Sequence, residues 1–340
     1  MGNFKHESSK IESAAKEIEF SGVIQVEKLN TPLIKRSFGY SNRSESLENN
    51  EETRFGIASG CKLFTAIAIV QLAEQGELSF DQKLSEVLDE SFPHFDPEVT
   101  IHHLLTHTSG IPDYFDEDVM EDFEELWKDR PMYRMNSLTD FLPLFQNEKM
   151  KFSPGEKFHY NNAGFILLGL IVEKVSGRRF TDYISEEIFT KCGMTSSGYF
   201  PLDQLPGNTA LGYIDEGDNW RTNIYSIPRV GGADGGAFTT AGDLSKLWAS
   251  LFSFSLLREE SVEKLLTLHS QEEEDDFYGY GIWITKREDS VFRYHIMGYD
   301  PGVSFHSAYY PAYYVTISVL SNKSEGAFDM LDAAEDHFLK

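Results

Sequence analysis

Two side chains that could do covalent chemistry lie three residues apart in the segment Ser59-Gly60-Cys61-Lys62. Residues at this spacing share one face at the start of a helix, so the Ser59 hydroxyl and the Lys62 amine can meet. A serine is a weak nucleophile at neutral pH, and an adjacent neutral amine can accept its proton. The start of a helix also offers free N–H groups that favour negative charge near the serine. The pattern predicts a nucleophile at Ser59 and its base at Lys62.

The same spacing recurs at Ser261 and Lys264, so spacing alone does not identify the nucleophile. Ser261 begins a charged amphipathic helix, whereas Lys62 is followed by the apolar run 63–70. A helix that is apolar on nearly every face is usually buried, and a buried lysine needs a reason to be there. Burial, together with the absence of a close carboxylate, would favour the neutral form of Lys62. We therefore prefer the first pair.

A second chemical signal is the turn-rich loop 152–162, which ends in Tyr160-Asn161-Asn162 and leads into an apolar helix. Tyr160 and Asn162 are two residues apart on an irregular segment, so both can point into one cleft. A phenol can relay a proton between a serine and a leaving group, and an amide can fix a substrate carbonyl. The same spacing at Tyr40 and Asn42 follows a hairpin strand and is typical of a turn.

The composition excludes several classes of partner. The chain has 340 residues, 41% of them hydrophobic, and a formal net charge of −25, which would repel nucleic acids and anionic membranes. Its two cysteines, Cys61 and Cys192, cannot form a disulfide framework, and Cys61 is expected to fill space beside the nucleophile. The polar N-terminus and the short apolar runs 63–70 and 163–172 predict no signal peptide and no membrane span. We expect a cytoplasmic protein, although a leader removed earlier would leave the same sequence.

The elements that must position these residues follow from periodicity and turn signals. We expect a helix at 7–18, strands at 22–26, 33–40 and 53–58, and then helices at 59–75, 101–107, 137–147, 161–176 and 180–189. Strands return at 279–286, 291–297, 302–309 and 313–321, and a helix at 326–339 follows. This order predicts an α+β fold with one antiparallel sheet built from both chain ends and flanked by helices. Residues 1–58 and 200–340 would form the sheet domain and 59–199 an inserted helical domain, with the active site at their junction.

Three other clusters receive plainer interpretations. His103 and His107 have a spacing found in some zinc helices, but no glutamate or third ligand accompanies them, so we interpret 106–110 as a polar helix end. The glycine-rich run 231–236 lacks the Lys-Ser or Lys-Thr of a phosphate loop and is expected to line the cleft, with Thr240 capping the next helix. The acidic runs 116–125 and 272–276 are interpreted as solvated surface.

Taken together, the motifs resemble the serine β-lactamase and penicillin-binding-protein superfamily, and most closely its class C β-lactamase-like branch, which includes D-peptidases and esterases. The resemblance covers residues 20 to 320 and rests on Ser59-x-x-Lys62, HLLTHTSGIPDY at 103–114, the segment 152–177, GGAFTTAGDLSKL at 235–247 and GYDPGVSF at 298–305. It implies a nucleophile at Ser59, a general base at Lys62, a proton relay at Tyr160 and a polar contact to substrate or lysine at Asn162. It also implies the β-lactamase/transpeptidase-like fold, and no metal or cofactor.

The third element of this family is a strand segment of a cation, any residue and glycine, and here it falls on Ile296-Met297-Gly298. The cation that meets a substrate carboxylate in the lactamases and carboxypeptidases is therefore absent. His295 is one residue away, and because strand side chains alternate it would face away from the cleft unless a bulge intervened. By resemblance, the oxyanion hole would use the backbone N–H groups of Ser59 and Tyr299.

This departure shifts the expected substrate away from penicillins and D-alanyl-D-alanine stems, although β-lactams remain within the reaction class. We expect a serine hydrolase that forms an acyl-enzyme with a small ester, amide or peptide. The alternative is a penicillin-binding or sensing module that is acylated without efficient turnover. The altered third motif supports the alternative, and the retained set of Ser59, Lys62 and Tyr160 opposes it.

Overall fold

The structure, a computed structural model, describes the backbone of residues 2–339 and the side chains of residues 10–339. Its main feature is an eight-stranded antiparallel sheet in the order β2-β1-β14-β13-β12-β11-β10-β9. The strands are β1 (Gly22–Lys28), β2 (Thr31–Phe38), β9 (Ser270–Gln271), β10 (Asp276–Tyr278), β11 (Trp283–Arg287), β12 (Ser290–Asp300), β13 (Val303–Tyr310) and β14 (Val315–Ser321).

Both ends of the chain contribute to this sheet, as predicted. Strand β1 pairs with β14 from Gly22 opposite Ser321 to Lys28 opposite Val315, so the first and last strands lie next to each other. Alternation then sends Ile24 and Val26 to one face and Val23 to the other, where they join different apolar cores. The expected antiparallel sheet built from both chain ends is confirmed.

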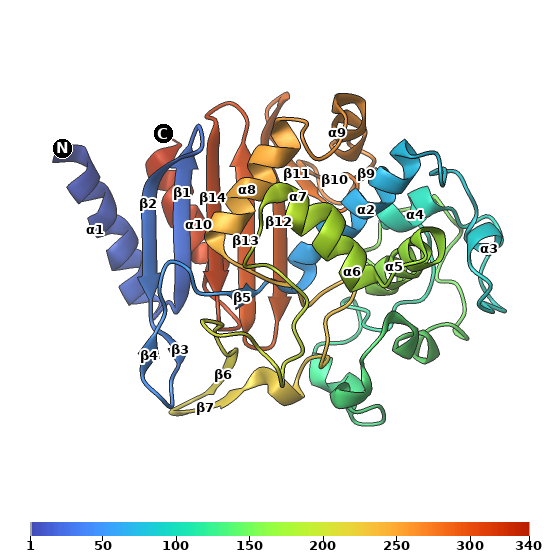
Figure 1. The fold of residues 1–340 in the computed structure, drawn as a ribbon, viewed down its shortest axis with the longest axis horizontal. Coiled ribbons are helices and arrows are strands. Elements are labelled where there is room, and N and C mark those ends of the chain that lie inside the picture. Colours follow the sequence, from blue (N-terminus) through green and yellow to red (C-terminus); the bar gives the residue numbers. More distant parts are fainter. Residues whose placement is uncertain (1, 340) are drawn as a thin grey trace.

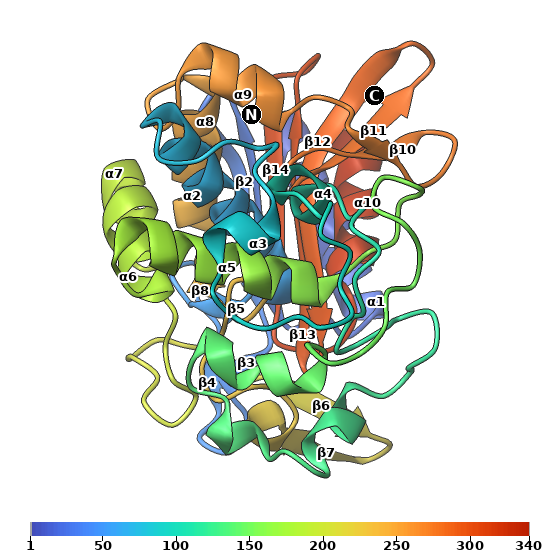
Figure 2. The ribbon, with the colours of Figure 1, turned by 90° about the vertical axis from the view of Figure 1, so that its right-hand side faces the viewer.

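Helices cover both faces of the sheet. On one face lie α1 (Gly2–Glu17) and α10 (Ala327–Phe338), and on the other lies α8 (Ala241–Phe252), as the edge-on view in Figure 2 shows. The apolar positions of α10 recur at helical spacing and are fully buried, for example Met330, Leu331 and Ala334. The layers thus follow from one apolar stripe per helix and one apolar face per strand.

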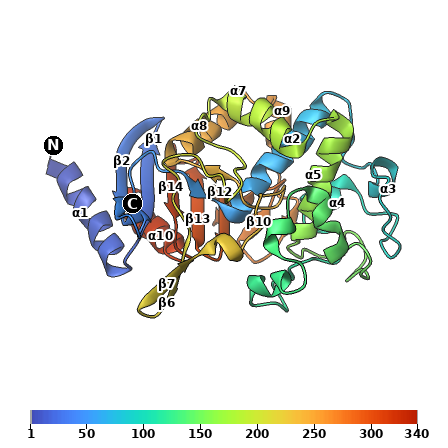
Figure 3. The ribbon, with the colours of Figure 1, turned by 60° about the horizontal axis from the view of Figure 1, so that its bottom comes forward.

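A helical region extends from one end of the sheet, opposite the end that carries α1 (Figures 1 and 3). It contains α2 (Lys62–Glu74), α3 (Leu84–Val87), α4 (Ile101–Leu105), α5 (Asn162–Ser176), α6 (Phe180–Ile184) and α7 (Thr190–Cys192), while α9 (Glu259–Leu265) packs against α2. In the described residues, no helix combines the length and the apolar character needed to cross a membrane. The division of the chain into domains at 58/59 and 199/200 stays a prediction.

Three sequence expectations about this scaffold are wrong. The expected strand 279–286 is β11 from Trp283 onward only, because residues 279–282 form the turn between β10 and β11, where the Gly279 N–H donates to the Ile282 oxygen at 2.8 Å. The expected strand 53–58 is only β5 (Phe55–Gly56), which pairs with β8 (Phe238–Thr239) outside the main sheet because its neighbours bond to the loops at 208–210 and 237. The expected helix 137–147 is two short 3-10 turns, since Pro143 lacks the N–H that a continuous helix would need. Two further strand pairs lie below the main sheet in the view of Figure 1. They are β3 (Tyr40–Asn42) with β4 (Leu47–Glu48), and β6 (Tyr213–Glu216) with β7 (Asn219–Thr222).

The packing of α10 against the sheet can be tested by truncating one of its buried side chains. Leu331 is fully buried, so Leu331→Ala should lower the free energy of unfolding by about 2–5 kcal/mol. The matched control is Leu47→Ala, whose side chain is 56% exposed and should cost less than about 1 kcal/mol. Urea unfolding followed by circular dichroism measures both, and equal losses would contradict this assignment of the core.

Candidate functional site

Ser59 lies in a tight turn between the sheet and the helical region. The residues Ala58–Cys61 form a 3-10 turn that continues into α2, so the serine immediately precedes the buried helix as predicted. Ala58 has φ of 42°, a conformation that non-glycine residues adopt only when their surroundings enforce it. A side chain at Gly60 would come within 2.3 Å of the Phe305 ring, so this position has no room for one. The turn is therefore held tightly against the sheet.

The Lys62 amine makes three short hydrogen bonds although its side chain is almost fully buried. Nζ lies 2.8 Å from Ser59 Oγ, 2.9 Å from Asn162 Oδ1 and 2.8 Å from the backbone oxygen of Asp234. The last two atoms can only accept hydrogen bonds, whereas the serine hydroxyl can also donate. A neutral amine would give its two N–H groups to these oxygens and turn its lone pair toward Ser59.

Other groups fix the orientation of the Asn162 amide. Its Nδ2 atom donates to Asp113 Oδ2 at 3.3 Å and to the Phe115 oxygen at 3.4 Å, which leaves Oδ1 to face Lys62. Asp113 also accepts the backbone N–H groups of Asn162 and Ala163, at 2.8 and 2.9 Å, and so caps α5. Asn162 thus contacts the lysine, one of the two roles that the resemblance implied.

Tyr160 lies beside the same amine. Lys62 Nζ is 4.9 Å from the centre of the phenol ring, which also stacks on Trp283 with ring centres 6.1 Å apart. Burial and the neighbouring Glu117 charge raise the pKa of Tyr160 well above its usual range, and the interaction with the Ser59 side chain opposes this only in part. The phenol is therefore protonated at neutral pH and able to give a proton.

His107 packs against Tyr160, a contact that the sequence did not reveal although His107 was considered there as one of a histidine pair. Its Nδ1 accepts the backbone N–H of Asn161 at 3.0 Å, and its ring centre lies 4.4 Å from that of Tyr160. It is buried with a φ of 55°, and burial lowers its pKa well below the usual range, so the ring is neutral. The expected polar helix end is confirmed by Thr106, which donates to the His102 oxygen at 2.8 Å.

Among the described residues no carboxylate forms an ion pair with Lys62, whose amine bonds to a hydroxyl, an amide oxygen and a backbone oxygen, but four carboxylates lie further out. Burial raises the pKa values of Asp113, Glu117, Asp234 and Asp300, and the Lys62 charge opposes this rise at each of them, so all four lie within its electrostatic reach. The pKa rises to about 7 for Asp113 and for Asp300. The sequence concealed the cluster because its members come from three separate segments. Each member stood in a segment already singled out for another reason: Asp113 in 103–114, Glu117 in the acidic run 116–125 interpreted as solvated surface, Asp234 in 231–236 and Asp300 in 298–305.

The residues of the third motif alternate between the two faces of β12, as the sequence predicted. A side chain at Gly298 would come within 2.3 Å of the Ile57 oxygen and 2.6 Å of the Ser59 nitrogen, so β12 meets the serine turn backbone to backbone. Ile296 lies on the same face but is only 2% exposed. His295 lies on the other face, bonded to His306 at 2.9 Å, and the β12–β13 register is continuous there. His295 therefore does not replace the missing cation.

The serine opens onto a cleft of about 540 Å³, lined on one side by Ser59, Asn162 and Tyr299. Most of the glycine-rich run 231–236 lines it as well, which confirms the expected wall, and Thr240 caps α8 by accepting the Asp243 N–H at 3.1 Å. Asp234 in this run also binds the Tyr114 hydroxyl, a pairing that the sequence did not reveal. Burial raises the pKa of Cys61 to about 12, so its thiol is inert and fills space as expected.

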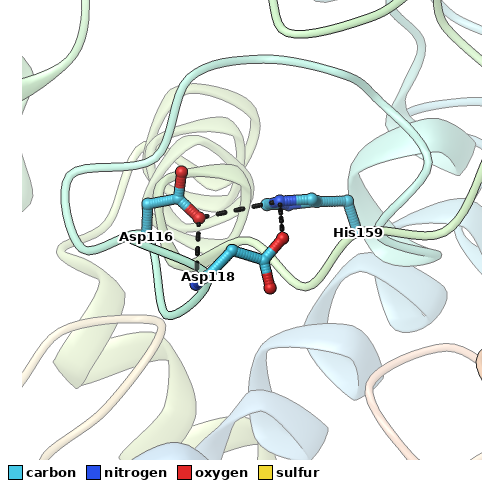
Figure 4. A group of neighbouring side chains, drawn as sticks. All are labelled: Asp116, Asp118 and His159. Carbon is cyan, nitrogen blue, oxygen red and sulfur yellow. Dashed lines mark hydrogen bonds and ion pairs between the residues drawn. The ribbon is translucent and has the colours of Figure 1, made fainter. Parts of the chain in front are cut away.

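A group with metal-ligand chemistry lies near the cleft (Figure 4). His159 Nε2 is 3.0 Å from Asp118 Oδ2 and 3.6 Å from Asp116 Oδ1. Asp116 also forms an ion pair with Lys151, so the chain itself supplies a cation to this group. We interpret these ion pairs as a structural link between the loop after Asp113 and the loop before Tyr160.

Comparisons with known proteins agree with this geometry. The family model described as Beta-lactamase matches residues 15–339. A penicillin-binding protein of Bacillus subtilis (strain 168) is 30% identical over 342 residues, which cover 94% of this chain and 72% of that protein. The crystal structure of a penicillin-binding protein from Bacillus halodurans is 55% identical, with a TM-score of 0.93 and coverage of 96% of this chain and 100% of that one. The octameric penicillin-binding protein homologue from Pyrococcus abyssi is 27% identical, with a TM-score of 0.84 over 98% of this chain and 76% of its own. The predicted resemblance and fold class are confirmed.

Because β12 touches the serine turn at Gly298, adding one methyl group there should lower activity strongly. Gly298→Ala should displace Ser59 from the strand and lower kcat/KM for an ester by about 100-fold. Gly207→Ala is the matched control, since a side chain there meets no atom within 4 Å and should change nothing. Initial rates with p-nitrophenyl acetate measure the effect, and full activity in a folded Gly298→Ala protein would contradict it.

The support given by His107 predicts different outcomes for two replacements. His107→Ala should lower kcat roughly tenfold, because the Asn161 N–H loses its acceptor and Tyr160 loses its neighbour. His107→Asn should retain most activity, since asparagine tolerates positive φ and offers an oxygen where Nδ1 was. Ester kinetics at matched protein stability compare them, and equal losses in both variants would exclude this positioning role.

Proposed function

Because the chain belongs to the beta-lactamase family of serine hydrolases, we propose that Ser59 is its nucleophile and Lys62 its general base. The observation that carries the proposal is the bonding of the Lys62 amine, whose two carbonyl acceptors leave the third position to the serine hydroxyl. The proton of Ser59 would move to Nζ as Oγ attacks the substrate carbonyl carbon. The rival Ser261 lies in α9, outside the residues that line the cleft.

Two further groups complete the acylation step in this proposal. The backbone N–H groups of Ser59 and Tyr299 would bind the oxyanion, each donor stabilising the transition state by about 3 kcal/mol. Tyr160, protonated at neutral pH, would pass a proton to the leaving group and regain one from Lys62. The carbonyl carbon then remains bonded to Ser59 Oγ as an ester. Asn162 would keep the lysine in place, and Gly298 would keep Tyr299 beside the serine turn.

Deacylation in this proposal reverses the same proton path. A water molecule replaces the leaving group, gives its proton through Tyr160 and Lys62 to Ser59 Oγ, and attacks the ester carbonyl. The products are a free acid and the restored hydroxyl. No step calls for a metal or cofactor.

The substrates we propose are small esters, amides or peptides, with β-lactams as further acyl donors. The buried Ile296 offers no charge to a substrate carboxylate, which disfavours ligands that depend on one. A location in the cytoplasm, expected from the sequence, is part of the same proposal.

The nucleophile and base are tested by three substitutions. Ser59→Ala should lower kcat for p-nitrophenyl acetate by at least about 1,000-fold, and Lys62→Met by about 100-fold or more. Ser261→Ala, at the same spacing in α9, should leave the rate unchanged. Adduct mass and product release identify the acyl-enzyme, and loss of turnover in a folded Ser261→Ala protein would overturn the assignment.

The alternative of a sensing module is decided by the fate of the adduct. Rapid release of p-nitrophenol together with acetate, and no lasting mass increase, is the result expected of a hydrolase. A stable adduct with a fluorescent penicillin and little product from the ester would instead show acylation without turnover.

A further inference from the structure

Three side chains of the types that bind metal ions meet near the cleft, and they come from two separate loops (Figure 4). His159 Nε2 lies 3.0 Å from Asp118 Oδ2 and 3.6 Å from Asp116 Oδ1, and the three ligand atoms all lie within 4.8 Å of one another. Ligand atoms that surround a zinc ion tetrahedrally at about 2.1 Å lie about 3.4 Å from one another. The spacing of the three atoms is therefore close to that of a metal site.

The backbone around these side chains holds them in place. Asp116 Oδ1 accepts the Asp118 N–H at 3.3 Å, and the backbone oxygen of Asp116 accepts the Met120 N–H at 2.8 Å, which closes a turn. The His159 N–H donates to the backbone oxygen of His107 at 2.8 Å. The side chains of Asp116 and His159 are only 12% and 14% exposed. Two of the three ligands are thus largely shielded from water and fixed before any ion arrives.

The other ring nitrogen of His159 shows which atom the ring can offer to a metal. Nδ1 lies 3.1 Å from the backbone oxygen of Tyr160, which can only accept a hydrogen bond, so Nδ1 carries a hydrogen. In the neutral ring, Nε2 then carries the lone pair and points it at the two carboxylates. A metal-binding histidine almost always donates its other N–H in this way, to a carbonyl or a carboxylate outside the ligand set.

The side chains of the protein alone cannot satisfy His159 Nε2. Lys151 Nζ, which also pairs with Asp116, lies 3.1 Å from Nε2, and an ammonium group only donates. A lone pair on Nε2 would face the Asp118 oxygen at 3.0 Å, whereas a hydrogen there would face the Lys151 ammonium. Either state leaves one repulsive contact. A divalent cation in place of the ammonium would attract the nitrogen and both carboxylates together.

We propose that Asp116, Asp118 and His159 bind a divalent transition-metal ion, with Zn²⁺ the best match, in place of the Lys151 ammonium. One imidazole nitrogen and two carboxylate oxygens are donors that suit zinc, whereas Mg²⁺ and Ca²⁺ prefer oxygen ligands alone. The Lys151 side chain is 26% exposed, so its ammonium can move into solvent when the ion binds.

Such an ion would join two loops that contact the candidate site. Phe115, next to Asp116, accepts the Asn162 amide with its backbone oxygen at 3.4 Å, and Tyr160 directly follows His159. The ion would tie these loops together and take no part in the proposed acylation. The metal site therefore does not depend on the proposed function, and direct binding measurements test it separately.

Zinc binding is measured by isothermal titration calorimetry of the full chain, after dialysis against EDTA, with ZnCl₂ at neutral pH. The wild type should bind one equivalent, and MgCl₂ should bind at least about 100-fold more weakly. His159→Ala removes the nitrogen ligand and should weaken zinc binding at least about 100-fold, and Asp118→Asn at least about tenfold. Zinc should also raise the unfolding midpoint of the wild type but not that of His159→Ala.

Lys151 distinguishes a metal site from a purely structural ion pair. Lys151→Met removes the ammonium that the ion must displace, so it should tighten zinc binding by about tenfold. If the four side chains only link the loops, the same substitution would lower the unfolding midpoint and zinc would bind neither protein. That result would overturn the proposal.

A second histidine pair supplies the matched control. The rings of His102 and His269 lie 5.3 Å apart and form the rival place for zinc, so His269→Ala should leave the affinity unchanged. Binding that persists in His159→Ala, or that is lost in His269→Ala, would show that zinc binds elsewhere and would contradict the assignment. If His159→Ala does not fold, Asp118→Asn decides the question, because that side chain is 76% exposed.

Discussion

The rest of the structure depends on the hydrogen bonds that compensate the buried Lys62 amine for its loss of water. Lys62 is about 1% exposed, and removing an amine from water is costly unless other groups replace the lost hydrogen bonds. Its partners come from three segments far apart in the sequence: the serine turn, the start of α5 and the glycine-rich run. Two of these residues are in turn bonded elsewhere: the Asn162 amide donates to Asp113, and the Asp234 carboxylate accepts the Tyr114 hydroxyl. The helical region and the sheet are therefore joined through the base of the proposed reaction.

The second constraint is the close approach of backbone to backbone at β12. Gly298 allows the strand to touch the serine turn, and Gly60 allows the turn to rest on Phe305. Neither contact would survive an added Cβ atom without movement. This approach brings Tyr299 into the lining of the cleft beside Ser59. Strand β12 is paired with β11 only as far as His295, but it continues to Asp300 beside β13. This continuation is the part of β12 that belongs to the candidate site.

The charge around this site differs from what the motifs alone would suggest. The surplus of acidic residues, net −25 over the chain, could have been spread evenly over a solvated surface. Six of these carboxylates instead line the cleft. Burial raises the pKa values of Asp113, Asp234 and Asp300 and the Lys62 charge opposes this rise, so the lysine and these carboxylates form one electrostatic unit.

The sequence by itself determined the chemical spacing and the layers. Ser59 and Lys62 had to share a face, Ile296 could not be a cation, and alternation placed His295 away from the cleft, because these follow from local periodicity. Only the tertiary structure decided which distant groups complete the site. Asp234 and His107 bond to residues 172 and 54 positions away in the sequence, and the loops that shorten the expected strand at 53–58 also come from distant parts of the chain. Local pattern carries no information about such contacts, since they arise only when separate elements pack together.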